Sequence, residues 1–229
     1  MPHTGTVHLP ALLRRAVFPL AVLPLLAGCS IGVPDPSVPP AASAAAPAPA
    51  VPTVTPGHDA DAVAARDLPF TAGETLAAGV PVQLSDGLQD APGWTAGPQD
   101  VAGTSQYRKA DGCQAAARVR TNQGPLAVPG DDKASTEALF GYLDPSILPS
   151  YLATDTLRWG GGPDKPSPRV EVLVYEGDKA GQRASVSYAR LFAKAGSSVY
   201  VSVSCPARSL LAAARADVTA RLAVLPPSA

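Results

Sequence analysis

The chain has 229 residues, a formal net charge of −1 at pH 7 and 46% hydrophobic residues. Its 18 basic and 19 acidic residues form no basic block along the sequence. Nucleic-acid partners and anionic membrane surfaces are both bound by clustered Lys and Arg, so the composition argues against a nucleic-acid partner and against polybasic membrane binding.

The amino terminus has the pattern of an export signal. Arg14 and Arg15 precede residues 16–27, AVFPLAVLPLLA, which carry no charge. A basic segment followed by a short apolar run is typical of a secretory signal peptide. The run is too short to cross a bilayer, which needs about 20 apolar residues.

The apolar run ends in Leu26-Ala27-Gly28-Cys29, which resembles the lipobox of bacterial lipoproteins. The resemblance implies cleavage after residue 28, attachment of fatty-acyl (palmitate-type) chains to the Cys29 thiol, and anchoring on the extracytoplasmic face of the cell membrane. The alternative is an ordinary signal peptide in which Cys29 is incidental. Heavy use of Ala and Pro with little Lys is associated with GC-rich, actinobacterial genomes.

Residues 29–67 are predicted to be the acylated cysteine and a disordered linker. Residues 33–56 contain eight prolines and seven alanines among 24 positions, with Asp35 as the single charge. Such a segment cannot bury enough apolar surface to fold, and its prolines favour an extended chain. A passive spacer is the simplest interpretation, and a ligand for a proline-recognition domain is the alternative.

Cysteine and histidine counts restrict the chemistry. With Cys29 acylated, Cys113 and Cys205 remain, and two cysteines in an oxidising compartment most often form a disulfide. Two separate buried thiols are the alternative. His58 is the one histidine outside the signal peptide, which argues against a histidine-dependent catalyst and against a zinc site. No phosphate-binding or dinucleotide-binding motif occurs, so no cofactor is expected.

Residues 68–229 are predicted to form a single globular domain. Strands are expected at 80–84, 104–109 and 114–121, with a turn leading to a packed Trp94 between the first two. A helix is expected at 131–143, with acidic residues at its start, followed by a short turn of helix at 147–152. An antiparallel meander at 169–176, 182–194 and 198–205 and a helix at 207–225 complete the order. This succession predicts an α+β fold with a mainly antiparallel sheet and at least two packed helices.

The element order, the Pro-Gly-Trp94 turn and the lipobox together resemble small actinobacterial surface lipoproteins with a Mog1/PsbP-like domain. The likeness covers roughly residues 70–225. It implies a binding or accessory role at the cell envelope, and no catalytic set is carried over.

Three tyrosines on successive predicted strands are the candidate binding surface: Tyr175, Tyr188 and Tyr200. If the strand register aligns them, they form an aromatic row that suits a ligand or partner. The alternative is ordinary cross-strand packing under a helix. Arg183 and Arg190 could orient an anionic ligand, although solvated strand charges are commoner, and Gly160-Gly161-Gly162 is interpreted as a loop.

The sequence therefore predicts a lipid-anchored, non-catalytic binding domain whose partners are the membrane, through Cys29, and an envelope protein or a small molecule. Two other functions remain open. One is a carrier of lipids or small molecules with an apolar cavity, and the other is an envelope hydrolase that works without histidine.

Overall fold

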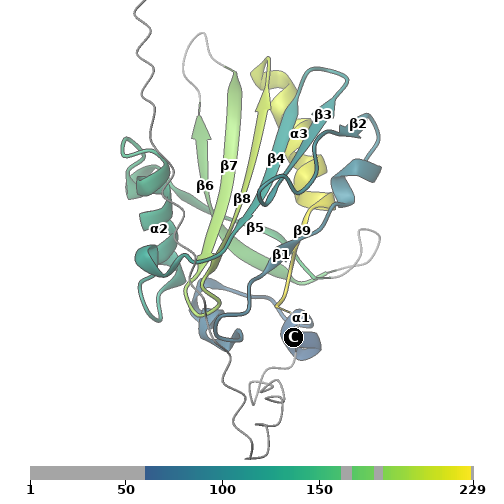
Figure 1. Cartoon of the computed structure of the whole chain (residues 1–229). Coiled ribbons are helices and arrows are strands. Elements are labelled where there is room, and N and C mark those ends of the chain that lie inside the picture. The colour runs from purple at the N-terminus through teal and green to yellow at the C-terminus, as the bar shows by residue number, and fades with distance from the viewer. Residues whose placement is uncertain (1–59, 161–166, 178–182, 228–229) are drawn as a thin grey trace, which may run out of the picture. The chain divides into compact units, whose positions relative to one another are not determined.

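A computed structural model describes residues 60–160, 167–177 and 183–227, which form a mixed α+β fold (Figure 1). The described part contains a nine-stranded sheet in the order β1-β9-β5-β6-β7-β8-β4-β3-β2. Neighbouring strands pair antiparallel, except that β5 and β9 pair in parallel. The predicted α+β class with a mainly antiparallel sheet is confirmed. The expected signal peptide, Cys29 and the linker as far as residue 59 lie outside the described residues.

The first half of the domain consists of short elements that supply both edges of the sheet, β1 at one and β2, β3 and β4 at the other. They are α1 (Ala60–Ala64), the 3-10 turn η1 (Phe70–Thr75), β1 (Gln83–Leu84), the 3-10 turn η2 (Gly87–Asp90), β2 (Trp94–Ala96), β3 (Thr104–Lys109) and β4 (Gln114–Arg120). The strands predicted at 104–109 and 114–121 match β3 and β4. The strand predicted at 80–84 is shorter, because Gln83 and Leu84 alone pair with β9.

The predicted central helix is confirmed as α2 (Asp132–Leu143). Asp131 caps it, because its side chain accepts a hydrogen bond from the Ala134 amide at 2.9 Å. The 3-10 turn η3 (Gly124–Leu126) precedes α2, and η4 (Pro149–Tyr151) follows it at the predicted short turn. Next comes β5 (Ala153–Trp159), a strand that the sequence did not predict. Its first half is polar and partly exposed, so the alternation that marks a strand is weak there.

The predicted meander is confirmed as β6 (Arg169–Gly177), β7 (Ala184–Phe192) and β8 (Ser197–Cys205). The last helix, α3 (Arg208–Arg221), is shorter than the predicted 207–225. Ala223 and Val224 are buried in β9 (Ala223–Leu225), between β1 and β5. The helix therefore gives way to a strand because the sheet takes up these residues.

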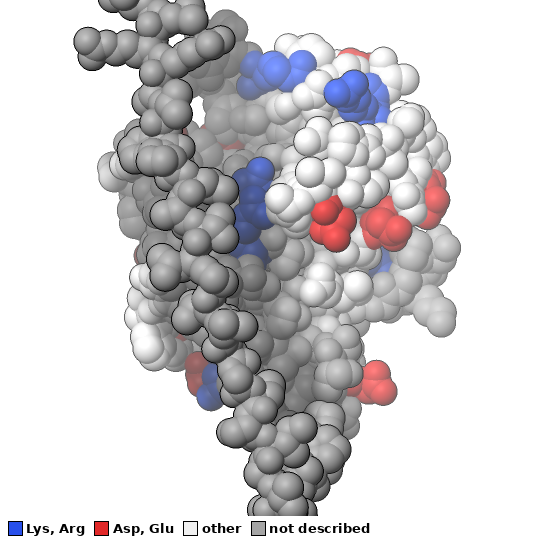
Figure 2. Space-filling view, in the orientation of Figure 1, with Lys and Arg blue, Asp and Glu red and all other residues white. Residues whose placement is uncertain are grey.

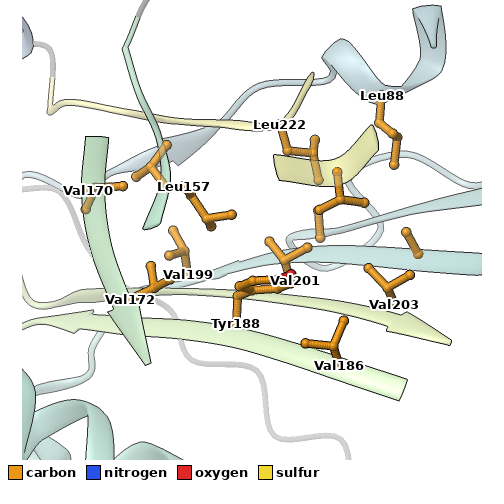
Figure 3. Packing of buried hydrophobic residues seen from close by; sticks show 14 of the residues in the cluster. Leu88, Leu157, Val170, Val172, Val186, Tyr188, Val199, Val201, Val203 and Leu222 are labelled. Atoms are coloured by element: carbon orange, nitrogen blue, oxygen red, sulfur yellow. The ribbon is translucent and has the colours of Figure 1, made fainter. Parts of the chain in front are cut away.

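The larger core lies between the sheet and α3 (Figure 3). Alternate residues of β6, β7 and β8 point into it, as the period-two pattern predicts, and so do Trp94 from β2 and Trp159 from β5. Ala214 and Val218 supply the buried stripe of α3. Because strands from both ends of the sheet contribute to this one cluster, the sheet curls around α3.

The second, smaller core lies on the opposite face of the sheet, under α2. Leu139 and Phe140 of α2 pack there against Leu173 of β6 and against Ala189 and Leu191 of β7. Along β6, Val170, Val172 and Val174 belong to the first core while Leu173 belongs to the second. The central strands are thus buried on both faces near α2, which explains why they are almost continuously apolar.

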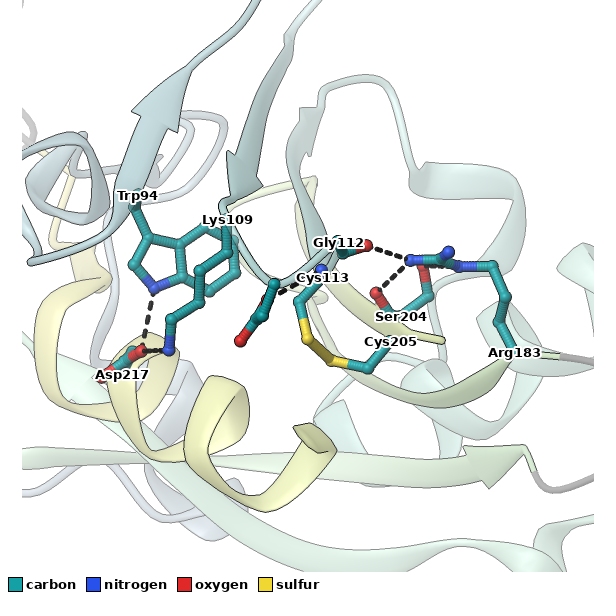
Figure 4. The surroundings of a disulfide bond; sticks show 9 residues. Trp94, Lys109, Gly112, Cys113, Arg183, Ser204, Cys205 and Asp217 are labelled. Atoms are coloured by element: carbon teal, nitrogen blue, oxygen red, sulfur yellow. Dashed lines mark hydrogen bonds and ion pairs between the residues drawn. A yellow bond between two sulfur atoms is a disulfide. The ribbon is translucent and has the colours of Figure 1, made fainter. Parts of the chain in front are cut away.

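A disulfide joins Cys113 and Cys205, as the cysteine count predicted (Figure 4). It connects the start of β4 to the end of β8, directly beside the paired residues Gln114 and Ser204. Both cysteines are 0% exposed and belong to the core on the α3 side. In the carboxyl-terminal half of α3, Asp217 accepts a hydrogen bond from the Trp94 indole at 2.9 Å and from the Lys109 ammonium at 2.6 Å. These contacts hold β2 and β3 against the helix.

Among the described residues, none of the helices has the length and apolarity that a bilayer crossing requires.

Candidate functional site

A cleft lies where β5 begins beside β6. Ala153, the first residue of β5, pairs with Val174, so the end of β6, Tyr175–Gly177, pairs with β7 but not with β5. The step at this edge leaves a cleft with a volume of about 590 Å³ between η4, the two strands and α3. Its polar and aromatic lining consists of Tyr151, Thr154, Asp155, Tyr175, Glu176 and Arg215.

Arg215 organises the charges of this cleft. Its guanidinium lies 2.6 Å from Asp155 Oδ2 through one nitrogen and 2.6 Å from Glu176 Oε1 through another. Partial burial by itself lowers the pKa of Arg215, but the hydrogen bond to Asp155, the electrostatic interaction with Tyr188 and the hydrogen bond to Glu176 outweigh it and raise the pKa. One cation thus holds two carboxylates, which turns both of them toward Arg215 and away from a substrate.

An exposed hydrophobic patch, consisting of Tyr142, Leu143, Leu148 and Tyr151, adjoins the cleft. These four are among the six large hydrophobic side chains that are exposed in the described residues. They all come from the end of α2 and the connection to β5, and Tyr151 belongs to both the patch and the cleft lining. A gathering of exposed apolar side chains is typical of an interaction site.

The three tyrosines predicted to form a row do not lie on one face. Tyr175 pairs with Ser187, and Tyr200 pairs with Ala189. Paired residues face the same side of a sheet, and successive residues of a strand face opposite sides. Tyr175 and Tyr200 therefore share the face of Ser187 and Ala189, whereas Tyr188, which lies between those two in β7, faces the other side. The prediction of an aromatic row is therefore wrong in register. Tyr175 alone of the three lines the cleft.

Tyr188 and Tyr200 serve the two cores instead. Tyr188 is 0% exposed on the α3 side, where the Arg215 guanidinium lies 5.7 Å from its ring centroid. Burial raises the pKa of Tyr188 to about 12, and the Arg215 charge opposes that shift. Tyr200 packs edge-on against Phe140 of α2 and shares a hydrogen bond of 2.8 Å with the Ser187 hydroxyl. The alternative interpretation, packing under a helix, describes Tyr200 well.

The other candidates have separate positions. Arg190 is fully buried and bound to Asp132, so it is not presented to a ligand. Arg183 is exposed at the start of β7, and its guanidinium donates to the carbonyls of Gly112 and Ser204. Within residues 60–160, 167–177 and 183–227, no group of three or more metal-ligating side chains gathers. Residues 161–166, which include two of the three glycines, lie outside the described residues, as does Cys29.

Sequence reasoning missed the cleft because its charged residues are far apart in the chain. Asp155 and Arg215 are separated by 60 positions, and β5, which carries Asp155, was not predicted. One signal in the sequence could have pointed to this region. Between Tyr142 and Tyr151, large hydrophobic residues lie among prolines and extend beyond the predicted end of the helix. No protein-family model matches the chain, and no curated protein matches it.

Proposed function

We propose that this protein is a lipid-anchored lipoprotein of the extracytoplasmic face, and that its domain binds a partner or ligand of the cell envelope without catalysing a reaction. The anchor is supported by Leu26-Ala27-Gly28-Cys29 behind a short apolar run. The Cys113–Cys205 disulfide supports an oxidising compartment, because such bonds are rare in reducing cytosol. That bond uses two of the three cysteines in the chain, so Cys29 is the one left for acylation.

The anchor is tested by replacing Cys29 with serine in the full-length chain. We expect the wild type to partition into the detergent phase and to show, by mass spectrometry, an amino-terminal cysteine with added acyl mass. The Cys29→Ser variant is expected in the aqueous phase, because a hydroxyl does not replace the acylated thiol. Acyl chains contribute about 0.8 kcal/mol per buried CH₂, so two chains make attachment effectively permanent.

A Cys113→Ser/Cys205→Ser double variant is the matched control, since it removes two cysteines but keeps the anchor. It should still partition into detergent. An unprocessed amino terminus on the wild type, or equal partitioning of wild type and Cys29→Ser, would contradict the anchor.

The observation that carries the binding role is the adjacency of the cleft and the exposed hydrophobic patch. The cleft offers two tyrosine rings, and its three charged side chains already satisfy one another. An apolar or aromatic group of a partner can therefore enter the cleft without burying an unpaired charge. Aromatic anchors in a hydrophobic surface dominate the binding energy of many protein interfaces.

Site-specific crosslinking tests this surface in intact cells. A photoreactive amino acid at position 151, where Tyr151 is 57% exposed, is expected to capture a distinct partner or ligand on illumination. Position 101 is the control, because Val101 is 61% exposed but lies in the loop before β3. Adducts of equal yield at both positions, or none at 151, would count against the proposed surface.

A further inference from the structure

The face of the sheet that carries α2 is only partly covered by that helix. Beyond α2, side chains of β3, β4, β8 and the start of β7 remain exposed or half-buried. The register brings small and polar residues into rows across these strands, such as Gln106, Ala116, Ser202 and Ser187. Figure 2 shows this side of the molecule in the orientation of Figure 1, with blue atoms in its upper and middle parts and red atoms mainly at its right-hand side.

Four arginines, which we call the arginine face, stand on this uncovered area: Arg108, Arg118, Arg120 and Arg183. Arg108 pairs with Gln114 in the same row as Ser204, and Arg118 pairs with Tyr200, which faces α2. Arg120 follows Arg118 by two positions and therefore points to the same side. Arg183 reaches Ser204 from the start of β7. Residues far apart in sequence thus assemble a basic surface that the linear sequence does not show.

The charges on the arginine face are not neutralised by carboxylates in the described part of the chain. Arg118 donates to the Thr104 hydroxyl, Arg120 to the Ala102 carbonyl, and Arg183 to the Gly112 carbonyl and Ser204. Strands β3, β4, β7 and β8 contain neither Asp nor Glu. By contrast, Lys109, Arg190 and Arg215 each contact a carboxylate within 2.7 Å. The arginine face is therefore a positive area in the described part of the domain, whereas Lys109, Arg190 and Arg215 are each paired with an acid.

We propose that the arginine face binds a linear polyanion that also carries hydroxyl groups, such as a carboxylated or phosphodiester-linked polymer of the cell wall. The arginines supply charge and forked donors, and Gln106, Gln114 and the serines supply neutral hydrogen bonds. A shallow polar pocket of about 140 Å³, lined by Arg108, Gln114 and Ser204 among others, lies within this area. With strands about 4.8 Å apart and about 3.4 Å per residue, the area measures about 14 by 20 Å, room for several repeating units.

The composition of this area favours such a polymer over a membrane or a protein. The large exposed hydrophobic side chains of the described residues are Val101, Val128, Tyr142, Leu143, Leu148 and Tyr151, and none belongs to β3, β4, β7 or β8. Stable protein interfaces have an apolar core, and peripheral membrane binding needs apolar insertion or a dense basic cluster. The arginine face provides neither, but its hydroxyls and guanidinia match a hydrated anionic chain.

The cell wall as the source of that polymer rests on the proposed extracytoplasmic function, whereas binding of a polyanion does not. The anchor and the binding are therefore tested separately. The purified full-length protein, with its Cys29 acylation checked by mass spectrometry, is titrated with polygalacturonate and with poly(glycerol phosphate). Neutral dextran and vesicles containing anionic phospholipid are the comparison probes. We expect both polymers to bind and dextran not to bind.

Binding should weaken with salt, because the polymer releases counterions. For flexible single-stranded polyanions the slope of log affinity against log salt is about −0.7 per neutralised charge, so four arginines give about −3. An Arg108→Gln/Arg118→Gln variant is expected to bind at least about tenfold more weakly, with a slope near −1.4. The control, Arg66→Gln/Lys194→Gln, removes the same charge elsewhere on the domain and should bind as the wild type does.

Chemical-shift mapping on the wild type gives a second measurement that does not depend on a variant folding. Amide shifts on polymer addition should concentrate at Gln106, Ala116 and Ser202 and leave α3 unchanged. Equal affinity of the two double variants, binding of vesicles but not of the polymers, or shifts confined to α3 would each overturn the proposal. If the wild-type protein carried no acyl group but still bound the polymers, the proposed anchor would be wrong and the polymer-binding proposal would stand.

Discussion

Replacing both Cys113 and Cys205 with alanine is expected to lower the free energy of unfolding by about 4 kcal/mol. The bond closes a loop with a sequence separation of 92, for which the chain-entropy model gives about 4–5 kcal/mol. The neighbouring pair Gln114 and Ser204 keeps β4 and β8 in register without it. The loss should therefore come mainly from the greater freedom of the unfolded chain, while the native fold is kept.

Urea denaturation of the oxidised wild type and of the double variant measures this loss. Because the uncrosslinked chain exposes more surface when it unfolds, the dependence on urea should also steepen. Cys29→Ser is the control, since it removes a cysteine that takes no part in the bond, and its midpoint should equal that of the wild type. Midpoints that coincide for wild type and double variant would refute the stabilising role of the bond.

The sequence predicted the elements whose pattern is local and regular. In β8, valines and Cys205 alternate with serines and Tyr200, and the structure buries the first set against α3. The acidic residues at 131 and 132 marked the start of α2 because the helix dipole favours negative charge there, and the structure shows Asp131 as its cap. The cysteine count predicted the disulfide because that prediction needed only an oxidising compartment and an even number of remaining cysteines.

The elements that were missed depend on long-range pairing. The segment Ala223–Leu225 continues the apolar pattern of α3, and only the room between β1 and β5 makes it a strand. Likewise, β5 has a polar first half because that part borders the cleft. The argument from composition against a nucleic-acid partner and against polybasic membrane binding was also a local one. The sequence has no basic run, yet folding gathers Arg108, Arg118, Arg120 and Arg183 on one face.

The tyrosine row failed for a different reason, which is the register. Shifting the pairing of two strands by one residue moves every side chain to the opposite face, and nothing in the sequence fixes that choice for Tyr188. Its neighbours Val186 and Phe192 point into the core on the α3 side, and Tyr188 follows them. A candidate surface inferred from several strands is therefore less secure than one inferred from a single segment, such as residues 142–151.

Replacing Arg190 with methionine should destabilise the domain more than any single exposed substitution. Arg190 and Asp132 are 0% and 2% exposed, and their side chains lie 2.7 Å apart. The guanidinium also donates to the carbonyls of Leu68, Glu171 and Pro69, so it connects the amino-terminal segment, α2 and the sheet. Burial lowers the pKa of Arg190, and Asp132 opposes that shift. Removing the cation leaves a buried carboxylate without its partner, which costs about 3–5 kcal/mol.

The comparison that isolates the pair is a double-mutant cycle in urea with Arg190→Met, Asp132→Asn and both together. Asp132 Oδ1 also accepts from the Ala193 amide at 2.9 Å, and asparagine keeps an acceptor there. The double variant should therefore lose clearly less than the two single losses combined, because it buries no unpaired charge. Lys194→Ala is the control, since its ion pair with Glu74 is 42% and 53% exposed and should contribute less than about 1 kcal/mol. If Arg190→Met lowered the free energy of unfolding no more than Lys194→Ala does, the buried pair would not be what holds α2 and the amino-terminal segment to the sheet. The position of α2 over only part of that face would then need another explanation.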